Sequence, residues 1–354
     1  MKNYLYLVFS LIVIIAACSS PSDKKFDKRF ILKEVYQTER DTSKNIDSPA
    51  LWNDGNGNAL LLATGKTSDD ISVYNALNGS YVQSVGSAGN GKLEFERPNG
   101  IFVIDSLLFV VERDNKRVQV LSLPEFRFIC FIGGQELIRP YGIFVYRPDS
   151  TNYRLYITDN YETEDELLPP PSELDERIKM YNLNYSGGLA EASFVKAFGD
   201  TSGAGMLRIV ESIAGDVENN KLLIAEEDSA YSSVKIYNLD GKFTGKEIPG
   251  KYFVGQIEGI SLFSSSASEN FWIITDQSYE DNSFKIFGRN AYEYIAEFVG
   301  PKTSNTDGIW LDNNPLPSFE KGLFLAVHDD GNVSAFDIKS VIDSVKIRRT
   351  SVRN

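Results

Sequence analysis

The stretch Glu258–Leu262 (EGISL), followed by Phe271–Asp276 (FWIITD), decides the fold of this chain, because the same two-part pattern occurs six times. In each copy a polar residue, often next to glycine, opens a short apolar run, and a second apolar run follows that usually ends in an acid. The other copies open at Ser48, Asn99, Tyr141, Glu211 and Asp307. Strand-sized runs that recur every roughly 40–50 residues are typical of a β-propeller with one sheet per blade. We therefore predict an all-β fold, a six-bladed β-propeller with four-stranded blades around a central channel.

In such a propeller the innermost strand of every blade lines the channel, so the six opening residues should face one axis. Asp47 lies directly before the first of them, Ser48. Three of the six are carboxylates (Glu211, Glu258 and Asp307), and carboxylates that share one ring repel each other unless a cation lies among them. Calcium prefers oxygen ligands of this kind. The sequence therefore predicts that function resides in this ring.

One domain is expected to use most of the 354 residues. We predict a propeller over residues 30–345 and a basic tail over residues 346–354. The strand-like segment Phe30–Thr38 is placed to complete the last blade. Residues 160–177 contain three consecutive prolines and are expected to form an insertion loop on blade three, either a lid over the channel or a solvated excursion.

The charge of the chain bears on its partners. The formal net charge is −13, which argues against nucleic acid, because a phosphate backbone needs a basic surface. An acidic protein suits divalent cations, although acidity alone also keeps an exported protein soluble. A lone histidine, His328, excludes phosphatases that need two histidines.

The N-terminus resembles a bacterial lipoprotein signal over residues 1–18, with a short apolar run that ends in small residues before Cys18. In this interpretation Cys18 carries lipid and residues 19–29 form a flexible tether. An ordinary cleaved signal peptide with an incidental cysteine is the alternative. The expected location is the bacterial cell envelope, with the protein lipid-anchored at the outer membrane, in the periplasm or at the cell surface.

Several motifs resemble those of the β-propeller phytases, which are six-bladed, calcium-dependent phosphatases. Residues 47–52 (DSPALW) are similar to the family's opening Asp-Asp-Pro-Ala-Ile-Trp, and residues 306–309 (TDGI) are the same as its Thr-Asp-Gly-Ile. Further similar segments are residues 210–212 (VES), 222–228 (LLIAEED), 256–260 (QIEGI) and 322–326 (GLFLA). The resemblance runs in order over about residues 45–335.

This resemblance implies a function and a set of site residues. The function is that of a 3-phytase-like phosphomonoesterase that hydrolyses myo-inositol phosphates by a metal-activated water, with Ca²⁺ as the cofactor. The implied metal ligands are Asp47, Glu211, Glu227, Glu258 and Asp307. The implied phosphate contacts are Lys66, Arg113 and Tyr141, and the implied catalytic residues are Glu211, Lys66 and Arg113. The expected partner is an inositol phosphate, with no nucleic acid, and the protein is expected to be a membrane-anchored monomer.

The chain also departs from the family's pattern. Ser48 and Gln256 stand where the family has aspartates, which removes two carboxylates from the site. A further family lysine in blade three has no clear counterpart, since Lys179 aligns only across the insertion. These departures predict a phosphate and calcium site with fewer charged groups than the family's.

Two other functions therefore stay open. Residues 97–101 (RPNGI) and 139–143 (RPYGI) also resemble the openings of NHL-type propellers, which are often non-catalytic binding modules. A calcium-dependent lactonase is the other alternative. Lys66 and Arg113 favour the phosphatase, because a phosphate needs cations and a lactone does not.

Overall fold

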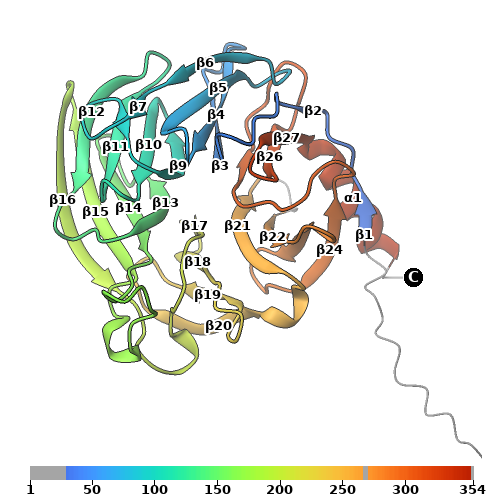
Figure 1. Ribbon diagram of the computed structural model, residues 1–354. Helices are drawn as coiled ribbons and strands as arrows, with labels where there is room; N and C mark the ends of the chain where they lie inside the picture. Colours follow the sequence, from blue (N-terminus) through green and yellow to red (C-terminus); the bar gives the residue numbers. More distant parts are fainter. Residues whose placement is uncertain (1–28, 266–269, 352–354) are drawn as a thin grey trace, which may run out of the picture.

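The computed structural model describes residues 29–265 and 270–351, and within them six sheets follow one another around a ring (Figure 1). The predicted six-bladed β-propeller is thus confirmed. The first strand of each blade is innermost, and neighbouring innermost strands contact each other around the ring. None of the helices in this part of the chain has the length and apolar character needed to cross a membrane.

Four antiparallel strands, consecutive in the chain, build each of blades one to five. Blade one contains β3 (Ile46–Asn53), β4 (Ala59–Gly65), β5 (Asp70–Asn75) and β6 (Tyr81–Val85). Blade two contains β9 (Pro98–Ile104), β10 (Leu107–Glu112), β11 (Arg117–Ser122) and β12 (Arg127–Gly133). Blade three contains β13 (Pro140–Tyr146), β14 (Asn152–Asp159), β15 (Ile178–Ser186) and β16 (Leu189–Phe198). Blade four contains β17 (Ile213–Asp216), β18 (Lys221–Glu226), β19 (Ser233–Tyr237) and β20 (Phe243–Pro249). Blade five contains β21 (Gln256–Phe263), β22 (Phe271–Gln277), β23 (Ser283–Gly288) and β24 (Tyr294–Val299). A small parallel pair, β7 (Ser87–Ala88) and β8 (Glu94–Phe95), precedes blade two.

The ring is closed by the N-terminal segment. Blade six contains β25 (Ile309–Asp312), β26 (Leu323–His328) and β27 (Asn332–Asp337), and β2 (Tyr36–Gln37) is its fourth, outermost strand. The segment predicted to complete the last blade therefore does so, but through two residues only. Its first part, β1 (Arg29–Ile31), pairs in parallel with β24 of blade five.

The C-terminal segment differs from its prediction. A tail was expected from residue 346, but α1 (Ile338–Ser351) continues through it. The residues of α1 at positions 338, 341, 342 and 345 are buried in an apolar cluster with Phe298 and Phe336 of blades five and six. That spacing places them on one face of a helix, which explains why the segment does not continue as a strand.

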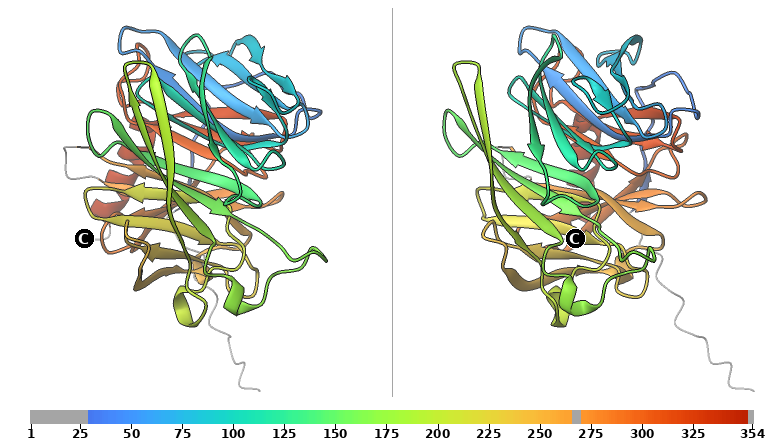
Figure 2. Two further views of the ribbon diagram at one scale, coloured as in Figure 1. Left: turned by 90° about the vertical axis from the view of Figure 1, so that its left-hand side faces the viewer. Right: turned by 60° about the vertical axis from the view of Figure 1, so that its left-hand side comes forward.

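The predicted insertion at residues 160–177 joins β14 to β15 and holds one short helix, η1 (Pro171–Glu173). Figure 2 shows the long β15–β16 hairpin extending at one end of blade three, with the insertion at the opposite end. Two more short helices flank blade four, η2 (Gly203–Gly205) and η3 (Gly250–Tyr252).

Candidate metal and phosphate site

The innermost strands carry a β-bulge at the mouth of the channel. In blade one, Ile46 pairs with Gly65 and Pro49 pairs with Ala63, which leaves Asp47 and Ser48 unpaired. The same irregularity leaves residues 99–100, 141–142 and 258–259 unpaired in blades two, three and five. In blades four and six the equivalent pairs, residues 211–212 and 307–308, directly precede β17 and β25. Because a bulge redirects side chains, the first residue of each pair is free to turn toward the channel.

The second residue of each pair packs against the backbone of the next blade. A Cβ atom at Gly142 would clash with the carbonyl oxygen of Glu211. The backbone N–H of Gly259 donates to the carbonyl oxygen of Asp307 (3.1 Å), and that of Gly308 donates to the carbonyl oxygen of Asp47 (2.9 Å). Glycine therefore recurs in the motif because adjacent blades meet here backbone to backbone, and this contact fixes the spacing of the ring residues.

This register corrects one prediction. The residue of blade one on the ring is Asp47, and the choice of Ser48 was wrong by one position. The apolar run of blade one begins with Pro49, which takes the place of the isoleucine that follows glycine in other blades. Ser48 thus occupies the glycine position, and its hydroxyl donates to Oδ2 of Asp47 (2.8 Å).

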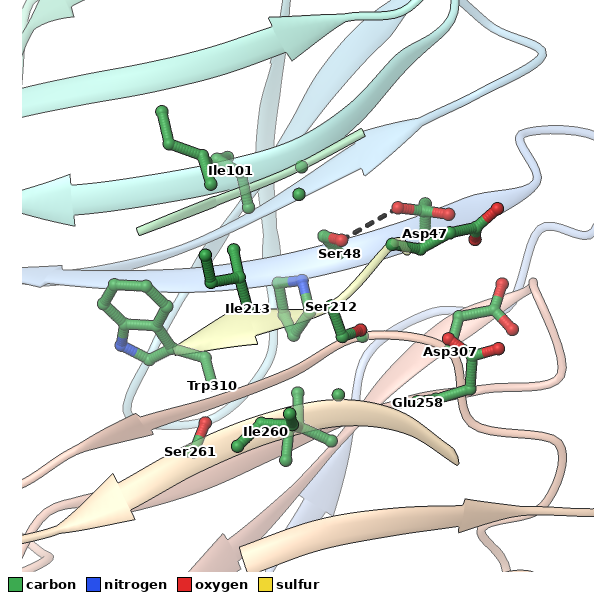
Figure 3. Close-up of a pocket in the computed structure, with 18 of the residues that line it drawn as sticks. Asp47, Ser48, Ile101, Ser212, Ile213, Glu258, Ile260, Ser261, Asp307 and Trp310 are labelled. Atoms are coloured by element: carbon green, nitrogen blue, oxygen red, sulfur yellow. Dashed lines mark hydrogen bonds between the residues drawn. The ribbon is translucent and has the colours of Figure 1, made fainter. Parts of the chain in front are cut away.

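Five of the six ring residues, all except Asn99, line a cavity of about 450 Å³ at the channel. Figure 3 shows the carboxylates of Asp47, Glu258 and Asp307 at one end of it and the apolar side chains of Ile213 and Trp310 toward the other. Lys66, Tyr141 and Glu211 also line this cavity. The sequence-predicted residues are thus brought together from five blades.

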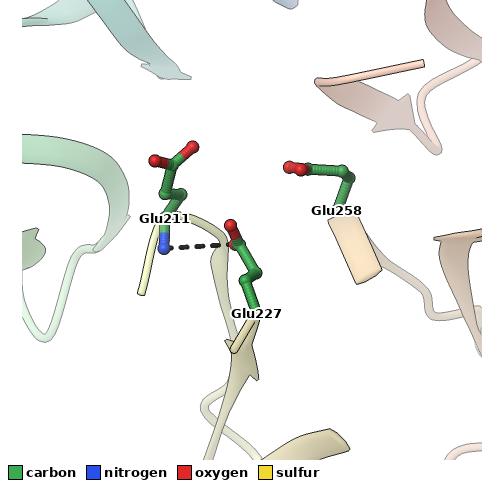
Figure 4. A group of neighbouring side chains, drawn as sticks. All are labelled: Glu211, Glu227 and Glu258. Atoms are coloured by element: carbon green, nitrogen blue, oxygen red, sulfur yellow. Dashed lines mark hydrogen bonds between the residues drawn. The ribbon is translucent and has the colours of Figure 1, made fainter. Parts of the chain in front are cut away.

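Three glutamates form the closest group. Glu211, Glu227 and Glu258 each offer a carboxylate oxygen within 4.8 Å of the others, and Figure 4 shows their side chains converging. Oε1 of Glu227 accepts the backbone N–H groups of Glu211 (3.2 Å) and Ser212 (3.4 Å). The amide of Gln256 donates to Oε2 of Glu227 (3.4 Å). Glu227, from the end of β18, is therefore oriented by the backbone of the neighbouring ring residue.

The two aspartates are bridged by Lys66. Its ammonium nitrogen lies 2.8 Å from Oδ1 of Asp47 and 3.3 Å from Oδ2 of Asp307. The phenol of Tyr141 donates to Oδ1 of Asp47 (3.2 Å). Lys66 is the only cationic side chain among the described residues that line this cavity. One ammonium therefore accompanies the four carboxylates that line this cavity, and a fifth carboxylate, that of Glu227, lies beside them.

The pKa values reflect this imbalance. Burial, followed by the charge of Asp47, raises the pKa of Glu211 to about 7 and that of Asp307 also to about 7. Burial raises the pKa values of Glu227 and Glu258 well above their usual range, with added repulsion from neighbouring glutamates. The pKa of the Tyr141 phenol is raised by burial and by the surrounding carboxylates. The protein therefore holds excess negative charge that a cation would relieve.

A second ring surrounds the first and was largely missed from the sequence. Each of its members lies at the end of the second strand of a blade. Lys66, Asn160 and Glu227 directly follow that strand, and Gln277 is its last residue. Gln277 donates to Asp307, and Asn160 donates to Oε1 of Glu211 (3.4 Å). Their common place after each second apolar run was the signal that could have identified Asn160 and Gln277.

The predicted cation Arg113 lies elsewhere, and so does Lys179, which aligns with the family's lysine only across the insertion. The backbone of Arg113 occupies the second-ring position of blade two, but its Nε pairs with Oδ1 of Asp114 (2.6 Å), and the side chain does not line the cavity. Lys179 is buried and pairs with Glu176. In the described structure, neither the guanidinium group of Arg113 nor the ammonium group of Lys179 thus lies at the ring carboxylates.

Acids at the ends of second strands have a different role from the ring acids. Buried Asp159 accepts the backbone N–H groups of Ile138 (2.9 Å) and Arg139 (2.7 Å), and Asp276 accepts that of Gly255 (2.7 Å). These carboxylates hold the loops that lead into the innermost strands. Their role is therefore structural.

The comparison with protein families agrees with this architecture. Residues 202–349 match the family model Phytase, which spans blades four to six. This match, together with the six-bladed propeller, supports a β-propeller phytase family. Blades one to three, which lie outside the matched residues, supply their ring residues through the bulges described above. No match to a curated protein was found. The family supports a phytase-type phosphatase, that is, a hydrolase.

Proposed function

We propose that this protein is a calcium-dependent, 3-phytase-like phosphomonoesterase that releases phosphate from myo-inositol phosphates. The observation that carries the proposal is a group of five carboxylates, four that line the channel cavity and Glu227 beside them, with a single ammonium among them. Calcium takes six to eight oxygen ligands, many of them carboxylate oxygens, so the donor set suits it. The amide of Asn99, the ring residue of blade two, is fully buried without a hydrogen-bond partner among the described residues, which also favours a missing ligand.

The residues proposed to hold calcium are Asp47, Glu211, Glu227, Glu258 and Asp307. When bound, calcium supplies positive charge for phosphate oxygens and lowers the pKa of a water that can attack phosphorus. The ring fixes these carboxylates before any ligand arrives, because the blade-to-blade backbone contacts position them. This preorganisation limits the cost of ordering the site.

The proposed phosphate contacts are Lys66, Tyr141 and Arg113. Asp47 and Asp307 hold the ammonium group of Lys66 at the channel. In this position the ammonium can also donate a hydrogen bond to a phosphate oxygen. Tyr141 stays protonated because its pKa is raised, so its phenol can donate as well. Arg113 must first leave Asp114. Glu211 is the proposed catalytic carboxylate, kept in orientation by Asn160.

The departures from the family bear on how much charge remains. Ser48 and Gln256, in place of aspartates, donate to the carboxylates of Asp47 and Glu227. These neutral donors lower the negative charge of the site, so calcium affinity should be lower than with two more carboxylates.

Phosphate release from phytate tests the proposal, measured with added calcium and with a chelator. We expect release only with calcium, and its loss in Glu258→Gln. Glu112→Gln, a buried carboxylate of blade two that pairs with Arg117, serves as the matched control and should retain release. Release that is indifferent to chelation would contradict the metal dependence. Calcium binding without release from any phosphomonoester would favour the binding propeller, and hydrolysis of a lactone alone would favour the lactonase.

We also propose that the protein is a monomer, lipid-anchored through Cys18 in the bacterial cell envelope. This proposal is supported by the signal-like sequence of residues 1–18, which lie outside the described residues, as does most of the tether.

A further inference from the structure

Four exposed apolar side chains gather at the channel-mouth end of blades four and five. Among the described residues, the six most exposed large hydrophobic side chains include Ile31 (70%), Tyr231 (53%), Val254 (82%) and Tyr279 (71%). Single exposed apolar residues are common on soluble proteins, but a group of them on one face marks an interaction surface. We call these four residues the apolar rim.

The loops that carry the apolar rim are in contact with one another. Tyr231 and Val254 line the same cavity, of about 770 Å³, between blades four and five. The loops of Val254 and Tyr279 meet backbone to backbone, since a Cβ atom at Gly255 would clash with the carbonyl oxygen of Gln277. The three side chains are therefore presented by one connected set of loops.

The N-terminal segment reaches the same loops. β1, which ends at Ile31, runs parallel to β24 at the outer edge of blade five. The guanidinium of Arg29 pairs with Asp281, in the loop that carries Tyr279. Arg29 is eleven residues after Cys18. Because an extended residue spans at most about 3.6 Å, a lipid on Cys18 keeps Arg29 within about 40 Å of the bilayer.

A bilayer surface suits the apolar rim better than a second protein does. A stable protein interface takes about 20–30 residues from each partner, far more than the rim offers. A tether raises the effective concentration of the surface to which it is attached, so a weak contact is enough to orient the protein. Tyrosine is enriched at membrane–water interfaces, where its ring contacts lipid and its hydroxyl contacts water.

The charges beside the rim are of both signs. The centre of the Arg208 guanidinium lies 3.5 Å from the centroid of the Tyr231 ring and covers one of its faces. Lys251 and Glu280 are both exposed on neighbouring loops. Contact with a bilayer should therefore depend on insertion of apolar side chains and not on the charge of the lipid.

We propose that the apolar rim rests on the bilayer to which the lipid anchor tethers the protein, so that the channel mouth lies beside the lipid head groups. The loops of the rim lead directly into the site, because Tyr279 follows Gln277, which donates to Asp307. This inference rests on the proposed lipid anchor for bringing the protein to the membrane. It does not depend on phosphate release.

Quenching of tryptophan fluorescence by lipid tests this orientation. The lipidated protein with Tyr279→Trp is reconstituted in vesicles of phosphatidylethanolamine and phosphatidylglycerol, with and without bromine on the acyl chains. After subtraction of the wild-type signal, the added tryptophan should be quenched by the brominated lipid, at low and at high salt alike.

Leu189→Trp is the matched control. Leu189 is as exposed (80%) and begins β16 at the turn of the β15–β16 hairpin, which extends at the end of blade three opposite the insertion (Figure 2). Its tryptophan should not be quenched. Equal quenching of the two tryptophans, or quenching of Tyr279→Trp that high salt abolishes, would overturn the inference.

A second substitution separates docking from tethering alone. In the Tyr279→Trp protein, Val254→Ser should lower the ratio of docked to undocked protein about ten-fold, because an apolar side chain no longer enters the lipid. Leu189→Ser in the same protein should leave the ratio unchanged. Quenching that is the same with and without Val254→Ser would overturn the inference.

The remaining outcomes distinguish this inference from the other proposals. None of these measurements needs calcium or substrate, so a lack of phosphate release would contradict only the proposed enzymatic function. A wild type that does not associate with the vesicles would overturn the lipid anchor and this inference together. Dimers of the detergent-solubilised wild type that Val254→Ser dissociates would assign the rim to a second copy of the chain and overturn the inference.

Discussion

Replacing Glu211 by glutamine should stabilise the calcium-free protein and weaken its response to calcium. Burial and the charge of Asp47 raise the pKa of Glu211 from 4.5 to about 7 in the folded state. Each tenfold change in a proton's dissociation constant corresponds to about 1.4 kcal/mol, so ionised Glu211 costs at most about 3 kcal/mol of folding free energy. Glutamine keeps the shape and can still accept from Asn160, but it carries no charge.

The effect of this substitution on the free energy of unfolding depends on pH. A carboxyl whose pKa is raised on folding favours the folded state at low pH, and this advantage is lost as pH rises from about 4.5 toward 7. In a chelator, Glu211→Gln should therefore raise the free energy of unfolding by at most about 3 kcal/mol at pH 8 and change it little at pH 5. Urea denaturation at the two pH values measures both quantities.

Calcium should reverse the order of stability of the wild type and Glu211→Gln. A ligand that binds only the folded state stabilises it by RT ln(1 + [L]/Kd), so a variant that binds calcium more weakly gains less. Glu112→Gln is the control: Glu112 is a buried carboxylate of blade two that pairs with Arg117 and does not line the channel cavity, so this change should not alter the calcium response. A Glu211→Gln protein that is less stable than wild type in chelator at pH 8, or equally stabilised by calcium, would refute the reasoning.

Two further predictions rest on contacts of the ring residues, and a third rests on the N-terminal sequence. Lys66→Ala should lower kcat/KM for a phosphorylated substrate about ten- to hundred-fold while calcium affinity in calorimetry is not weakened, since Lys66 competes for the carboxylates; a loss of calcium binding would count against its assigned role. Gly142→Ala should lower the free energy of unfolding by about 1–3 kcal/mol in urea titrations and disturb the adjacent Glu211, because the added Cβ meets the carbonyl oxygen of that residue; an unchanged midpoint would contradict the backbone contact. Cys18→Ser, expressed in a bacterial host and fractionated, should move the protein from membranes to the soluble fraction, and persistent membrane association would argue against the lipid anchor.

The architecture could be predicted from the sequence because each blade of a propeller is a repeat formed by consecutive residues of the chain. Six copies of a polar opening and two apolar runs predicted six blades, and the ring residues Tyr141, Glu211, Glu258 and Asp307 occupied the same place in every copy. Alternating strand patterns and turn residues depend on near neighbours in the chain. The predicted convergence of these side chains then followed from the symmetry of the fold.

The register of the strand pairs and the direction of individual side chains could be seen only in the tertiary structure. Asp47 replaces Ser48 on the ring because of the bulge between β3 and β4, and a sequence pattern does not reveal which residues a strand pair leaves unpaired. The guanidinium group of Arg113 pairs with Asp114, although the backbone of Arg113 occupies the second-ring position of blade two. The stacking of Arg208 on Tyr231 joins residues that no repeat relates. Each of these outcomes depends on contacts between loops and strands distant in the chain, and only the folded backbone brings those partners together.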